Sequence, residues 1–102
     1  MARKRANKNF KFKNADGIEY EIIFRKPDKR TNAGVHGLCY HPDDKKPRIY
    51  INPYLTNQSE LNTIIHEIAH AFFWNKTEKE IAKFANTCSR FLYNKGKWRK
   101  EE

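Results

Sequence analysis

The sequence has few cysteines, no long apolar run and fewer acidic than basic residues. Its two cysteines, Cys39 and Cys88, are too few for a disulfide framework, and we expect both thiols to stay reduced. No apolar run approaches the roughly 20 residues that a membrane-spanning helix needs. The basic start also lacks the apolar segment of a secretory signal. We therefore expect a cytoplasmic protein without a membrane partner.

Basic residues outnumber acidic ones. The chain has 21 lysines and arginines but only 12 aspartates and glutamates, which gives a formal net charge of +9. The cations concentrate before the first acid, Asp16, and again between residues 95 and 100. Basic ends are typical of proteins that bind nucleic acid, but they are equally typical of a surface that only keeps the protein soluble. No known DNA- or RNA-binding motif is present. The length predicts one domain over residues 1–102, with basic, flexible ends at about 1–8 and 97–102.

Four short segments in the first half are rich in β-forming residues or alternate apolar with polar ones. The predicted strands cover residues 9–13, 18–25, 38–41 and 48–52. An Asp-Gly pair at residues 16–17 predicts a hairpin between the first two strands. Pro47 and Pro53 flank the fourth strand and favour a place for it at a sheet edge.

Two amphipathic helices follow the strands. Apolar residues recur at i, i+3 and i+4 between residues 61 and 73, and Thr56 or Ser59 can cap this helix. A second helix follows the N-cap candidate Thr77 and ends before Gly96. Its apolar stripe, which we expect to face the core, contains Ile81, Phe84, Ala85, Cys88, Phe91 and Leu92. The predicted fold is α+β: a small, mostly antiparallel sheet of three to four strands, then two packed antiparallel helices.

His66, Glu67 and His70 form the pattern H-E-x-x-H inside the first predicted helix. Residues four apart lie one above the other on a helix, so the two imidazoles can bind one metal ion. Glu67 would then lie beside the metal's open position, where a carboxylate can take a proton from water. The helix is apolar nearly all round, so we expect the sheet and the second helix to bury it. The three polar residues would then line a cleft.

A catalytic zinc usually has three protein ligands, so a third is expected from the second helix. Its first turn contains Glu78 and Glu80. On a helical wheel Glu78 lies beside small alanines that allow close approach, whereas Glu80 lies beside bulky phenylalanines. Glu80 also stands three residues after Thr77, where a capping box would use it. We therefore predict His66, His70 and Glu78 as ligands, with Glu80 as the alternative.

A second group of ligand-type residues, His36, Cys39 and His41, lies close together along the chain. A structural zinc site normally has four ligands, and no fourth histidine or cysteine is nearby. Either histidine can instead stabilise the oxyanion of a tetrahedral intermediate, and this choice stays open. Cys88 is most simply a small buried apolar residue.

Residues 48–98 resemble the minimal gluzincin-type zinc metallopeptidases, in particular the small SprT-like and phage-type ones. The resemblance lies in RIYIN, LNTIIHEIAHAFFW and TEKEIAKFANTCSRFLYNKGKW. In these families the second helix supplies a glutamate ligand, often within E-x-x-A-D or E-x-x-A-N, whereas Ala82 stands here in place of the Asp or Asn. The resemblance implies a Zn²⁺ ion held by His66, His70 and Glu78, with Glu67 as general base.

The resemblance implies hydrolysis of peptide bonds in a polypeptide substrate by zinc-activated water. In zincin folds an edge strand beside the active-site helix holds extended substrate, and residues 38–41 or 48–52 could do so here. SprT-like proteases act on DNA-associated proteins, which implies substrates of that class. The alternative function is that of a small basic accessory protein of a phage or mobile element, which binds nucleic acid without catalysis.

Overall fold

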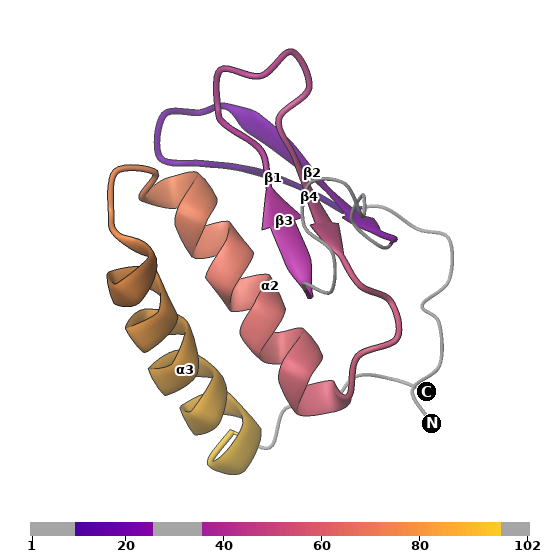
Figure 1. Cartoon of the computed structure of the whole chain (residues 1–102), viewed down its shortest axis with the longest axis vertical. Coiled ribbons are helices and arrows are strands. Elements are labelled where there is room, and N and C mark those ends of the chain that lie inside the picture. Colours follow the sequence, from indigo (N-terminus) through magenta and orange to yellow (C-terminus); the bar gives the residue numbers. More distant parts are fainter. Residues whose placement is uncertain (1–9, 26–35, 97–102) are drawn as a thin grey trace.

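The computed structural model describes residues 10–25 and 36–96 of the chain. The basic ends at about residues 1–8 and 97–102, with their predicted nucleic-acid contact, lie outside the described residues. Figure 1 shows a layer of strands beside α2, with α3 on the far side of α2. The elements are β1 (Phe10–Lys13), β2 (Glu19–Phe24), β3 (Gly37–Cys39), β4 (Arg48–Ile51), α2 (Asn57–Phe72) and α3 (Glu78–Asn94).

The four strands form one sheet in the order β1-β2-β4-β3. β1 pairs antiparallel with β2 through the predicted hairpin, in which Gly17 adopts a φ of 77° that favours glycine. β3 pairs antiparallel with β4, whereas β2 and β4 run parallel. The predicted α+β fold with a mostly antiparallel sheet is therefore confirmed.

The fourth strand is central, so the prediction that its flanking prolines place it at an edge is wrong. β4 lies between β2 and β3, and its residues Ile49 and Ile51 are fully buried. Pro47 and Pro53 lie just outside the strand, and the Pro47 carbonyl accepts a hydrogen bond from the Glu21 amide at 3.3 Å. A proline lacks only its own N–H, so one that ends a strand leaves the ladder intact. The edge strand beside α2 is β3.

The core lies between the inner face of the sheet and α2. Tyr20, Ile49 and Ile51 are fully buried there, at alternate positions of their strands. Phe12 extends this core, because its ring stacks on Tyr20 at 5.6 Å and on Phe72 of α2 at 6.0 Å between centroids. The sheet therefore holds α2 along its apolar side and leaves the polar residues of the motif on another side.

Each helix has a threonine as its N-cap. The Thr56 hydroxyl accepts a hydrogen bond from the Ser59 amide at 3.3 Å, so Thr56 rather than Ser59 caps α2. Thr77 and Glu80 form the predicted capping box of α3, in which the Glu80 carboxylate accepts from the Thr77 amide at 3.1 Å. Neither described helix has the length and apolar character that crossing a bilayer requires.

The apolar stripe of α3 faces the core only in part. Ile81 and Ala85 are 2% and 0% exposed, whereas Phe84, Phe91 and Leu92 are 49%, 62% and 38% exposed. The prediction of a core face is therefore wrong for these last three. Among the described elements, α3 packs mainly on α2, and such a contact covers only part of a helix's circumference.

Strand β3 approaches α2 closely at Gly37. A Cβ atom at this position would lie 2.7 Å from Cγ2 of Thr63, 3.0 Å from the Tyr50 carbonyl oxygen and 3.1 Å from Cγ of Glu67. Because real side chains do not tolerate such contacts, only glycine lets the edge strand lie directly against the turn of α2 that carries the motif.

Gly37→Ala is expected to destabilise the fold by about 1–3 kcal/mol, the usual cost of overpacking. Chemical denaturation would measure the free energy of unfolding. The Thr63→Ser background removes the nearest methyl group, Cγ2 of Thr63, so the same Gly37→Ala change should cost less there. An equal cost in both backgrounds would contradict the contact as the source of the effect.

Candidate metal centre

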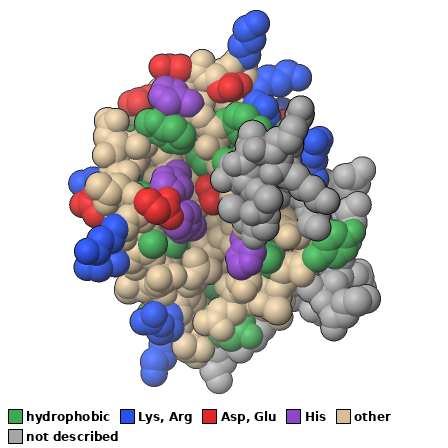
Figure 2. Space-filling view, in the orientation of Figure 1, with side chains coloured by type: hydrophobic (Ala, Val, Ile, Leu, Met, Phe, Trp, Pro, Cys, Tyr) green, Lys and Arg blue, Asp and Glu red, His purple; other side chains and the backbone are tan. Residues whose placement is uncertain are grey.

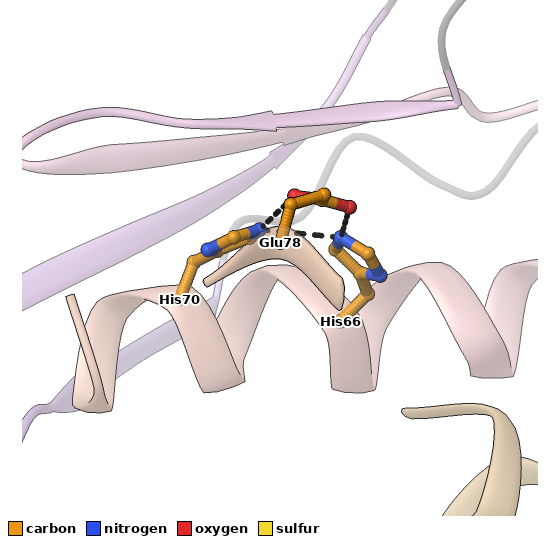
Figure 3. Close-up of side chains that lie close together, drawn as sticks. All are labelled: His66, His70 and Glu78. Carbon is orange, nitrogen blue, oxygen red and sulfur yellow. Dashed lines mark hydrogen bonds and ion pairs between the residues drawn. The ribbon is translucent and has the colours of Figure 1, made fainter. Parts of the chain in front are cut away.

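His66, His70 and Glu78 meet at the surface between α2 and the start of α3. The two histidines lie one turn apart on α2, and their Nε2 atoms are 3.2 Å apart. Glu78, the first residue of α3, places one carboxylate oxygen 2.8 Å from Nε2 of His66 and the other 2.8 Å from Nε2 of His70. Figure 3 shows the three side chains pointing toward one another.

The link between the helices explains why Glu78 stands there. Residues 73–77 turn the chain back, with the Lys76 amide donating to the Phe73 carbonyl, so α3 starts beside the last turns of α2. The Thr77 cap then fixes Glu78 as the first helical residue. Glu80 is directed to the Thr77 amide instead. Of the two predicted candidates, the structure brings only Glu78 to the histidines.

The three side chains fit a zinc ion in chemistry and in spacing. Zinc binds imidazole nitrogen and carboxylate oxygen at about 2.0–2.2 Å, which separates neighbouring ligand atoms of a tetrahedral site by about 3.3 Å. The nearest nitrogen and oxygen atoms here are already 2.8–3.2 Å apart. Small outward displacements would therefore admit an ion. Among the described residues, this is also the one group of three or more that could hold a metal.

A cleft of about 620 Å³ opens beside this group. α2 forms one wall of the cleft and β3 contributes to the other, as predicted for a motif that faces neither the core nor open solvent. Figure 2 shows histidine and acidic side chains gathered around a hollow on this face. Its lining includes His36, Gly37, Leu38, Cys39, Asn62, Thr63, His66, Glu67, His70, Trp74 and Glu78.

Residues 15–91 match the Peptidase_M78 family, described as an IrrE N-terminal-like domain. The matched segment covers most of the chain and includes the motif and nearly all of α3. The chain belongs to this family. Peptidase_M78 is a zinc metallopeptidase-like family, so the predicted relation to such enzymes is confirmed, while the narrower likeness to SprT-like and phage-type members stays a prediction. No curated protein and no solved structure matches the chain.

Glu67 lines the cleft beside the candidate ligand group and is buried, with only 8% of its surface exposed. Burial raises the pKa of its carboxyl group to about 7, and the nearby Glu78 carboxylate contributes to this rise. Burial also lowers the pKa of His66, although the neighbouring Glu78 opposes this effect. A neutral imidazole offers a lone pair to a metal, and a carboxyl that titrates near neutral pH can exchange protons there.

The second predicted group, His36, Cys39 and His41, does not assemble into a metal site. His36 and Cys39 line the cleft. His41 lies outside it, where its ring packs edge-on against Trp74 at 4.8 Å and its Nδ1 accepts from the Asp43 amide. Burial raises the pKa of the Cys39 thiol to about 12, so it stays protonated and is a poor metal ligand.

The predictions from sequence missed Asn62, a cleft residue on the helical face of the two histidines. Asn62 lies one turn before His66 on α2, so the same four-residue spacing could have found it. The Asn62 amide also donates to Asn86 Oδ1 at 2.7 Å and to Ser89 Oγ at 3.1 Å. Asn62 therefore ties α2 to α3 beside the metal centre.

The buried Glu67 should make the metal-free protein less stable as the pH rises. Its pKa is near 4.5 when unfolded and about 7 when folded, so the cost of its burial is absent below pH 4.5 and complete above pH 7. Glu67→Gln removes this titration. As the pH rises from 4.5 to 7, the variant should therefore gain about 3 kcal/mol of stability relative to the wild type.

Urea denaturation of the chelated proteins at several pH values would measure this difference. The effect of His66 is common to both proteins and cancels in the comparison. A difference that does not change with pH would contradict the raised pKa of Glu67.

Proposed function

We propose that the protein is a zinc-dependent peptidase whose metal is held by His66, His70 and Glu78. One observation carries the proposal: two imidazoles and one carboxylate converge in a cleft directly beside a buried glutamate. Three protein ligands leave a fourth position open, which distinguishes a catalytic zinc from a structural one. Membership of the Peptidase_M78 family supports the same chemistry.

Glu67 and His36 then have distinct roles beside a metal held by the three ligands. His66, His70 and Glu78 would hold the zinc ion, which would polarise the scissile carbonyl as a Lewis acid and make a water molecule more acidic. Glu67 takes the proton of the attacking water and passes it to the leaving amine, for which a pKa near neutrality is suited. His36 lines the same cleft, where a positioned donor stabilises the oxyanion.

β3 provides a main-chain template for the polypeptide substrate. Tyr40 donates a hydrogen bond to β4, and the His36 carbonyl accepts one from the residue that follows β4. In an antiparallel ladder the backbone groups of the intervening Gly37 and Cys39 therefore point away from β4. Both residues line the cleft, so an extended peptide can pair with them by β-augmentation. With β4 in the centre of the sheet, residues 38–41 rather than 48–52 fill this role.

The basic character of the chain bears on the substrate class. A formal net charge of +9 attracts polyanions over a long range at low ionic strength. This charge supports a substrate that is acidic or associated with nucleic acid. A protein that binds nucleic acid without catalysis would need neither the convergent ligand group nor the buried glutamate beside it.

Glu78→Gln and Glu80→Gln form a matched pair that tests the third ligand. Each removes one charge from the first turn of α3, and glutamine still satisfies a capping box at position 80. Glu78→Gln should weaken zinc binding by about 100-fold or more, because losing a ligand costs at least as much as losing an outer partner. Glu80→Gln should leave the affinity unchanged. Competition with a chromogenic chelator gives both dissociation constants, and equal losses would contradict the assignment of Glu78.

Glu67→Gln should retain stoichiometric zinc but lose peptidase activity by at least about 100-fold, the usual contribution of a general base. Hydrolysis of denatured casein and of a quenched fluorescent peptide library would measure this loss, with zinc content measured on the same samples. Chelation should abolish the wild-type activity and added zinc should restore it. A Glu67→Gln variant that cleaves at the wild-type rate would refute the role of Glu67.

A further inference from the structure

An exposed apolar stripe runs along α3, away from the metal centre. It consists of Phe84, Cys88, Phe91 and Leu92, which we call the α3 stripe. Phe84 and Phe91 are 49% and 62% exposed, Leu92 is 38% exposed and Cys88 is half-buried. None of the four lines the metal cleft. A contiguous group of this kind differs from the scattered exposed apolar residues that any protein surface contains.

The spacing of the α3 stripe matches a helix contact. At 100° per residue Phe84 and Phe91 lie about 20° apart, and Cys88 lies within about 40° of Phe84. Ala85, which is fully buried, lies about 100° away from Phe84. The stripe therefore points sideways, at about a right angle to the contact with α2. A further helix can pack against the stripe, alongside α3 in the same layer.

The charge around the α3 stripe indicates what kind of helix fits. Residues 81–96 include Lys83, Arg90 and Lys95 and contain no aspartate or glutamate. The carboxylate of Glu80, one turn before Phe84, is bonded to Thr77 in the capping box. Figure 2 shows lysine and arginine side chains along the side of the molecule where α3 lies. A second copy of the chain would bring another formal charge of +9 against this basic surface. Complementarity favours an acidic occupant instead.

We propose that the α3 stripe binds an amphipathic helix of an acidic partner protein. Apolar side chains of the partner, spaced at i, i+3 or i+4 and i+7, would pack against Phe84 and Phe91. Its acidic side chains would lie over Lys83, Arg90 and Lys95. The contact leaves the metal cleft open, so binding does not depend on zinc or on the proposed peptidase activity.

Two probe peptides of about 14 residues test the proposal, a length at which an isolated helix is marginal and binding can order it. Both carry leucines at the stated spacing, and one has glutamates and the other lysines at its polar positions. Fluorescence anisotropy with the full chain at low salt should show binding of the acidic peptide at least tenfold tighter than that of the basic one. Added salt should weaken the acidic complex.

A double variant, Phe84→Ser with Phe91→Ser, should weaken binding of the acidic peptide at least tenfold. Tyr54→Ser is the matched control, because Tyr54 is 57% exposed but lies outside α3, and it should leave binding unchanged. The wild-type chain gives a second readout that needs no variant. The acidic peptide should slow alkylation of Cys88 severalfold, whereas the basic peptide should leave the alkylation rate of Cys88 unchanged.

Several results would overturn the proposal. Absence of binding, equal binding of the two peptides, or binding that the double variant leaves intact would each do so. A dimer in analytical ultracentrifugation that the double variant dissociates would make a second copy the occupant. Binding that appears only after Trp98→Ala would make the chain's own end, beyond the described residues, the occupant. Zinc affinity measured on the same samples tests the metal site independently.

Discussion

The antiparallel contact between α2 and α3 is the interaction on which the candidate site depends. α2 carries two imidazoles on one face, and the short link returns the chain so that the first residue of α3 reaches them. The sheet holds the opposite side of α2, and Gly37 lets the edge strand lie against the same helical turn. One helix therefore connects the apolar core, the candidate ligand group and a wall of the cleft.

Stability and chemistry compete within this arrangement. Glu67 is buried where its charged form is disfavoured, which costs folding free energy at neutral pH but gives the carboxyl a pKa of about 7. Strain of this kind is common at functional sites, where surrounding packing offsets the local cost. The fully buried Ile49 and Ile51 of β4 belong to the core that supplies such packing.

Sequence patterns predicted all six elements and the cluster of histidines, because spacing along a helix or strand is a local property. Helix geometry also favoured Glu78 over Glu80, since the cap at Thr77 fixes which acid faces α2. The errors concern partners distant in sequence. A proline beside a strand does not reveal whether another strand pairs there, so β4 was misplaced. Periodicity shows that Phe84 and Phe91 share a face of α3, but not whether another element covers that face.

The capping box at the start of α3 lies outside the ligand group, yet it governs how long that group stays assembled. Helix ends fray, and the first turn of α3 is held by the reciprocal bonds between Thr77 and Glu80. Whenever that turn opens, Glu78 leaves its place beside the two imidazoles. The fraction of molecules that are competent to hold a metal is thus tied to the local opening equilibrium of a single helical turn.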